Sequence, residues 1–142
     1  RSFLHPALAL FDAPAREECT VERSQSNTPL QALLLLNDPS YVEAARVFAT
    51  KILSEGGNGD RERLDYAFQQ ALARNIESSE RQVLHDLLAK HRTHYRAHPK
   101  EAEEVLAVGL AKAPEELDAA ELAAWTSVAR TVLNLHETLT RN

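Results

Sequence analysis

Several features on which common protein classes depend are missing from this sequence. It contains one cysteine, Cys19, in 142 residues, so neither an intramolecular disulfide nor a cluster of thiolate metal ligands can form. No run of about 18 apolar residues occurs, and we therefore expect no membrane insertion. Gly-rich phosphate loops, C-x-x-C-H haem motifs and G-x-S-x-G nucleophile elbows are absent as well. From these absences we predict that the chain holds no cofactor.

Methionine is also absent, and the first residue is arginine. We therefore expect the chain to be part of a longer polypeptide. Its length of 142 residues is the usual size of one domain, and its hydrophobic share of 44% is that of an ordinary globular protein. We predict a single helical domain over residues 1–142, in which residues 1–27 are irregular and residues 28–142 are helical.

A concentrated basic surface is missing too. The net charge is −5, and the most basic stretch runs from Arg81 to Lys100. Its charges are typical of a solvated helix face, whereas nucleic-acid-binding proteins usually present a clustered basic patch. We expect no nucleic-acid partner.

What is present is a series of helix caps and apolar residues at helical spacing. No stretch alternates in the manner of a strand, so the sequence predicts an all-α fold. We expect a compact bundle of about six helices with an irregular N-terminal segment. The predicted helices span approximately residues 28–36, 39–54, 60–75, 77–98, 99–109 and 118–139.

Some of these boundaries depend on single residues. Asp60 is predicted to cap the third helix, and Asn75 to end it. Asp118 and Glu121 have the spacing of a capping box, and the helix that they start is expected to reach about Leu139. The fourth helix is expected to bury four apolar side chains, those of Val83, Leu84, Leu87 and Leu88.

Polar residues gather around the first two predicted helices, which are otherwise apolar. We call this set the polar corner. Because buried polar groups need partners, these side chains either satisfy one another and hold the two helices together or form a surface for a ligand or partner. We favour the structural interpretation. The polar corner comprises Asp12, Arg23, Asn27, Thr28, Gln31, Asn37, Glu43 and Arg46.

Three histidines have a spacing that suits a metal ion. His91, His94 and His98 stand at i, i+3 and i+7, so on a helix they share one face. Basic neighbours oppose a cation there, and Pro99 disfavours a helical conformation at the residue before it. We therefore prefer a solvated helix end to a metal site, and keep the three histidines as the metal candidates of this chain.

Several segments of the chain together are typical of one family: Phe11-Asp12-Ala13-Pro14, Cys19-Thr20, Asn27 to Leu33, Leu36 to Pro39, Glu43 to Arg46, Arg74, Glu80 and several segments from Ala124 to Arg141. In these segments the sequence resembles the planctomycete-specific C-terminal domain of unknown function that occurs in large exported proteins, often beside a cytochrome-c-like domain. This resemblance implies an exported protein, periplasmic or at the cell surface, of which this chain is the C-terminal part. It implies no catalytic residues, because no activity is established for the family.

Two functions follow as hypotheses. We favour a non-catalytic structural or interaction module that packs against the upstream domains of its own parent chain. The alternative is that the domain completes an extracellular hydrolase or redox site, acting for instance on polysaccharide, with Asp12, Arg23, Glu43 or Arg46 contributing side chains. For this chain by itself we expect no enzyme activity.

Overall fold

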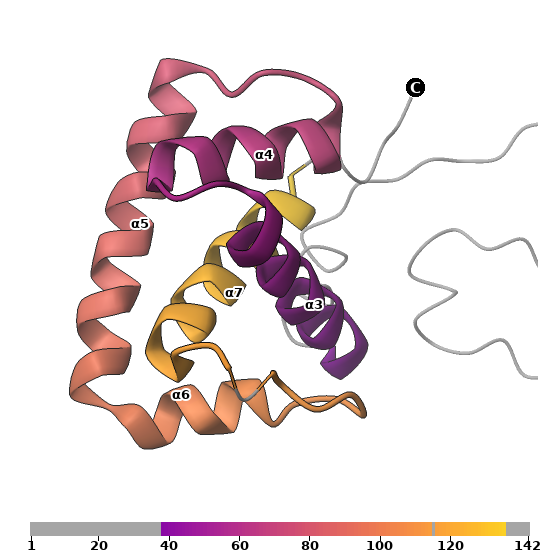
Figure 1. The fold of residues 1–142 in the computed structure, drawn as a ribbon, viewed down its shortest axis with the longest axis vertical. Helices are drawn as coiled ribbons and strands as arrows, with labels where there is room; N and C mark the ends of the chain where they lie inside the picture. The colour runs from indigo at the N-terminus through magenta and orange to yellow at the C-terminus, as the bar shows by residue number, and fades with distance from the viewer. Residues whose placement is uncertain (1–37, 115, 136–142) are drawn as a thin grey trace, which may run out of the picture.

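The computed structural model describes residues 38–114 and 116–135, and every regular element within them is a helix. Figure 1 shows the arrangement. The all-α prediction is confirmed for these residues, while the first predicted helix, at residues 28–36, lies outside them. None of the described helices is both long and apolar enough to cross a membrane. The helices are α3 (Pro39–Glu55), α4 (Asp60–Leu72), α5 (Ser78–Ala97), α6 (Pro99–Leu106) and α7 (Ala119–Leu133).

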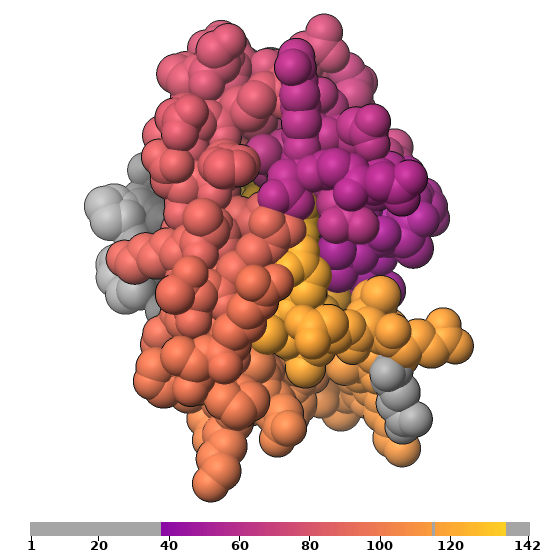
Figure 2. All heavy atoms as spheres, turned by 60° about the vertical axis from the view of Figure 1, so that its left-hand side comes forward, coloured from indigo at the N-terminus to yellow at the C-terminus, as the bar shows by residue number. Residues whose placement is uncertain are grey.

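Helix α7 lies in the centre of the bundle. It packs against α3, α4, α5 and α6, which surround it in Figure 1. On the face drawn in Figure 2, the beginning of α7 shows as a band between α5 and the α3–α4 pair. Because α7 is apolar on nearly all sides, it has to be covered by its neighbours. Its buried residues are Leu122, Ala123, Ala124, Trp125, Thr126, Val128, Ala129 and Val132.

The predicted starts of α3, at residue 39, and of α7, at the Asp118 cap, are confirmed. The Asp38 carboxylate accepts a hydrogen bond from the Ser40 backbone N–H at 2.8 Å, and Pro39 is the first helical residue. The Asp118 carboxylate accepts from the Glu121 N–H, also at 2.8 Å. In each case the side chain satisfies a backbone donor that has no partner within the helix.

Three predicted helix boundaries, one start and two ends, are wrong. Gly59, not Asp60, is the residue that precedes α4, and Asp60 is the first residue of the helix itself. Helix α4 ends at Leu72, before Asn75, because Ala73 takes a left-handed conformation with φ 55°. Helix α7 ends at Leu133 instead of near Leu139, and a turn follows in which the Asn134 N–H donates to the carbonyls of residues 130 and 131.

The predicted burial in α5 is correct for its central residues and wrong for Val83. Leu84 and Leu88, one turn apart, are buried, and Leu87 beside them is partly buried. Val83 is 65% exposed. The prediction from apolar character alone therefore made the buried face of α5 too wide. The observed face follows the spacing of Leu84 and Leu88.

We expect the packing of α3 against α7 to be sensitive to added volume at Ala49. This residue is completely buried, so an Ala49→Leu substitution inserts three carbons into a filled core and should lower the free energy of unfolding by about 1–3 kcal/mol. Val47, on the same helix, is 55% exposed, and Val47→Leu should change stability by less than about 0.5 kcal/mol. Urea unfolding followed by circular dichroism measures both, and equal stabilities of the two variants would contradict this packing.

Candidate functional site

Two residues of the polar corner, Glu43 and Arg46, lie within the described part of the chain, one turn apart on α3. Both face the connection between α6 and α7. The other six lie outside the described residues, so their predicted roles stay predictions: Asp12, Arg23, Asn27, Thr28, Gln31 and Asn37.

Glu43 holds the backbone of the α6–α7 connection. Its two carboxylate oxygens accept hydrogen bonds from the N–H groups of Leu110, at 3.0 Å, and Ala111, at 2.7 Å. These two backbone donors, with a smaller contribution from the charge of Arg46, lower the pKa of the Glu43 carboxyl. Gly109 makes the approach possible, because it has φ +99° and a Cβ placed there would lie 2.4 Å from the Glu43 carboxylate.

Arg46 is a buried cation with few partners. It is 1% exposed. Its Nη2 donates to the carbonyl oxygen of Ala111 and lies 3.9 Å from the Glu43 carboxylate. Its Nε and Nη1 atoms are buried and have no hydrogen-bond partner among the described residues. Buried donors of a charged group are costly when they stay unpaired, so an acceptor beyond those of the described residues would stabilise Arg46.

An open groove of about 330 Å³ adjoins Arg46, between α3 and the α6–α7 connection. Three of its lining residues are cationic and two carry hydroxyl groups. Its single carboxylate, on Glu55, lies 3.9 Å from the Lys51 amine and offsets part of that charge. The groove therefore suits an anionic or hydrogen-bond-accepting group. Its lining residues are Arg46, Val47, Thr50, Lys51, Ser54, Glu55, Lys112 and Pro114.

Arg92 joins three helices through a second set of ion pairs. Its guanidinium binds the Asp60 carboxylate, at the start of α4, through two nitrogens at 2.5 and 2.7 Å. It also binds the Glu121 carboxylate, at the start of α7, at 2.5 and 2.8 Å. Glu121 in turn accepts from the indole N–H of the buried Trp125 at 2.9 Å. The two acids raise the pKa of Arg92, and the hydrogen bonds from Arg92 are the largest cause of the lowered pKa of Asp60.

A third ion pair closes the turn between α4 and α5. Arg74 donates to both carboxylate oxygens of Glu80, at 2.9 and 2.6 Å, and its guanidinium lies 5.2 Å from the centre of the Phe68 ring. Glu80 also accepts from the Glu77 N–H at the start of α5. The hydrogen bond from Arg74 is the largest cause of the lowered pKa of Glu80. Arg74 and Glu80, which the family resemblance includes, thus form a structural pair.

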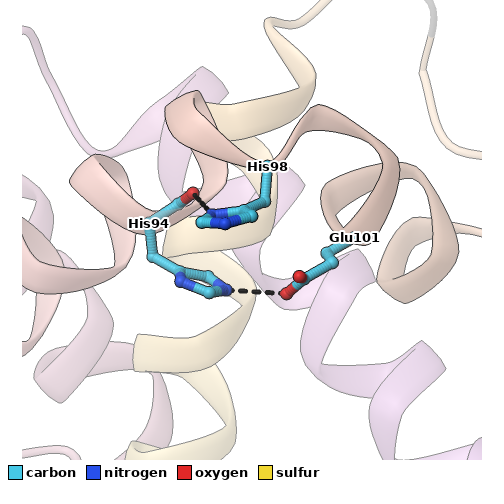
Figure 3. A group of neighbouring side chains, drawn as sticks. All are labelled: His94, His98 and Glu101. Carbon is cyan, nitrogen blue, oxygen red and sulfur yellow. Dashed lines mark hydrogen bonds and ion pairs between the residues drawn. The ribbon is translucent and has the colours of Figure 1, made fainter.

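The three histidines separate into two environments. His91 is half-buried and its ring stacks on Tyr95 at 5.7 Å between centroids; burial is the main cause of its lowered pKa. His94 and His98 are exposed, and their rings stack at 4.7 Å. Figure 3 shows these two beside Glu101 of α6. Among the described residues, the third potential metal ligand beside His94 and His98 is therefore Glu101. His91 does not belong to this group.

The sequence indicates the contact of Glu101 with His94 only weakly, and the contacts of Arg92 with Asp60 and Glu121 not at all. Glu101 follows His94 by seven positions, but Pro99 interrupts the helix between them, so helical spacing alone does not place the two together. Asp60, Arg92 and Glu121 lie far apart along the chain and meet through tertiary packing. The sequence alone places Arg92 in the basic stretch from Arg81 to Lys100, as part of a solvated helix face and a charge that opposes a metal ion, and does not indicate its two acidic partners.

One family matches the chain. The model of the family PSD1, described as a protein of unknown function (DUF1553), matches residues 1–88. The matched range includes α3, α4 and the first half of α5, with Arg46, Arg74 and Glu80. The stretch from Ala124 to Arg141, which also carries the resemblance, lies outside it. No curated protein and no solved structure matches the chain.

We expect the Arg92 ion pairs to contribute more stability at neutral pH than in acid. At pH 7, Arg92→Gln should lower the free energy of unfolding by about 1.5–3 kcal/mol, because it removes charged hydrogen bonds to two partly buried carboxylates. The pKa of Asp60 is lowered from 3.8 in the folded protein, so the stabilisation from its charge is present above that value and is lost as the pH falls through the lowered pKa.

The difference between the wild type and Arg92→Gln should therefore narrow below about pH 4. Arg96 lies one turn further along α5 and is exposed, so Arg96→Gln serves as the matched control and should leave the stability within about 0.5 kcal/mol of the wild type at neutral pH. Urea unfolding at a series of pH values gives these quantities. A constant difference between wild type and Arg92→Gln over the whole series would contradict the assigned role of Asp60.

The turn at Gly109 yields another test. Gly109→Ala should lower the free energy of unfolding by about 1–3 kcal/mol, since the new Cβ meets both a left-handed backbone and the Glu43 carboxylate. The neighbouring Leu110 is 99% exposed, and Leu110→Ala should be nearly neutral. Thermal unfolding compares the two variants, and a wild-type melting temperature for Gly109→Ala would show that Glu43 does not hold this turn.

Proposed function

The chain belongs to the PSD1 family, a family of proteins of unknown function (DUF1553), and from this premise we propose that it is a non-catalytic structural or interaction module. In this proposal the bundle packs against the upstream domains of a larger exported protein, of which it is the C-terminal part. The partner supplies an acidic side chain to the groove beside Arg46. The contacts that Glu43 and Arg46 of α3 make with the α6–α7 connection support this proposed role.

The observation that supports the proposal most strongly is the burial of the Arg46 guanidinium with too few hydrogen-bond acceptors among the described residues. A cation that is 1% exposed and has two nitrogen atoms without acceptors among the described residues is expensive to bury unless a further acceptor reaches it. A carboxylate provides that acceptor and matches the planar guanidinium in geometry. The groove next to Arg46 gives such a group a path to it.

The charges at the rim favour the same partner. Lys51 and Lys112 line the groove and are both exposed. Exposed charges of one sign around a binding site steer an oppositely charged partner and reject a like-charged one. An acidic segment therefore fits this surface better than a neutral or basic one.

The contacts of Glu43 give less support to the alternative, a hydrolase or redox site. A catalytic carboxylate needs an oxygen free to reach a substrate. Both oxygens of Glu43 already accept hydrogen bonds from the backbone of Leu110 and Ala111. This arrangement suits a residue that holds a turn in place.

We expect the chain to bind the separately produced upstream part of its parent protein with a Kd below ~1 μM, or about −8 kcal/mol. Isothermal titration calorimetry at low and high salt measures the affinity, which should fall as salt screens the rim charges. Arg46→Gln should weaken binding by about tenfold or more, because it removes the charge of a residue that lines the groove.

Because Arg46→Gln also affects the core of the bundle, the double variant Lys51→Glu, Lys112→Glu gives a second test on exposed residues. It should weaken binding while leaving the circular dichroism spectrum unchanged. Arg61 is exposed on α4 outside the groove, and Arg61→Gln should bind like the wild type. The proposal fails if no binding occurs, or if the Lys51, Lys112 variant binds as tightly as the Arg61 variant.

A further inference from the structure

We propose that His94, His98 and Glu101 form a zinc-binding site where α5 ends and α6 begins. The inference is independent of the groove beside Arg46, which lies on α3. It depends on three features of this junction: the proximity of the donor atoms, the orientation of the His98 ring and the placement of the surrounding charges.

The break between the two helices brings the three donors together. His98 has φ −129° and ψ 68°, which is not helical, and Pro99 then starts α6 in a new direction. As a result, Glu101 turns back toward the last turn of α5, and its carboxylate lies 2.7 Å from Nε2 of His94 (Figure 3). One ligand atom from each of the three residues lies within 4.8 Å of the other two.

The donor separation that a zinc site needs falls between the 2.7 Å of the His94–Glu101 pair and the 4.8 Å limit of the set. A zinc ion about 2.1 Å from each donor holds the donors roughly 3.4 Å apart in a tetrahedral arrangement. All three side chains are exposed, so small rotations of them are enough to close the site. The ion would replace the direct contact between Nε2 of His94 and the Glu101 carboxylate.

The backbone already orients one of the ligands. Nδ1 of His98 lies 3.0 Å from the carbonyl oxygen of His94 and donates a hydrogen bond to it. This hydrogen bond fixes the tautomer and leaves the lone pair of Nε2 free for a metal. A backbone carbonyl that accepts from the other ring nitrogen is the usual partner of a metal-binding histidine.

The surrounding charges allow a cation at this position. Arg92, the basic residue nearest in sequence to His94 on its N-terminal side, is already paired with Asp60 and Glu121. The other basic side chains nearby, those of Lys90, Arg96 and Lys100, are exposed to solvent, where water and salt screen them. The carbonyl end of the long helix α5 favours a positive charge, and Glu101 supplies one full negative charge.

The donor set indicates the class of metal. Two imidazoles and one carboxylate suit zinc and its neighbours among the divalent transition metals better than calcium or magnesium, which prefer oxygen ligands only. Three protein ligands leave a fourth position for water. Since that position faces solvent, the bound ion would link the two helices and keep an accessible coordination site.

The experiment is a titration of the whole 142-residue chain with zinc chloride near neutral pH, followed by calorimetry and by thermal unfolding. The wild type should bind one zinc ion at this site and melt at a higher temperature in its presence. His98→Ala and Glu101→Gln should each weaken zinc binding by about tenfold or more, because each loses a ligand. Both residues are exposed, so we expect both variants to keep the fold, which circular dichroism checks.

His91→Ala is the matched control, since it removes a histidine of the same helix that lies outside the ligand set; it should bind zinc like the wild type. Cobalt(II) provides a second readout, because cobalt in a site of low coordination number absorbs visible light more strongly than hydrated cobalt. The absorption band should appear with the wild type and His91→Ala and be lost with Glu101→Gln. Equal zinc affinity in all variants, or no binding by the wild type, would overturn the proposal.

Discussion

Helix α7 carries apolar side chains on nearly all sides, and such a helix is stable in water only when other helices cover it. Its indole, that of Trp125, and its small residues such as Ala123 and Ala124 are completely buried. The small residues allow neighbouring helices to approach closely, while the indole, near the middle of α7, fills a larger part of the core. The four other described helices take the positions that this covering requires.

Covering α7 also decides where charges are placed. The Trp125 indole N–H needs an acceptor once it is buried, and Glu121 provides it one turn earlier. Glu121 then requires a cation, which α5 supplies as Arg92, and Arg92 reaches Asp60 with its remaining donors. A chain of partners that begins with a buried ring therefore ties together the starts of α4 and α7.

The connection between α6 and α7 is held in a different way. There α3 presents Glu43 and Arg46 to the connection that follows α6. Glu43 is satisfied by backbone donors, whereas Arg46 keeps two buried donors without acceptors in the described residues. Glu43 therefore holds a turn in place, whereas Arg46 can accept a further partner. The function proposed above follows from this property of Arg46.

Local chemistry was enough to predict much of the fold. Pro39 and Asp118 determine where α3 and α7 begin, since a fixed φ and a capping carboxylate act within a few residues. The periodic leucines of α5 likewise identify its buried face. The end of α4 was not predictable in this way, because Ala73 takes a left-handed conformation that its sequence neighbours do not require.

The sites were decided by tertiary structure. Spacing along a helix favoured His91 as a companion of His94 and His98, but the helix breaks at Pro99 and places Glu101 there instead. Likewise, nothing local links Arg92 to Asp60, 32 residues away. The sequence by itself determined the helical class and most helix starts, because these depend on interactions within a turn or two. Which side chains meet depended on how the helices cover α7, because that packing brings together residues that are distant in the chain.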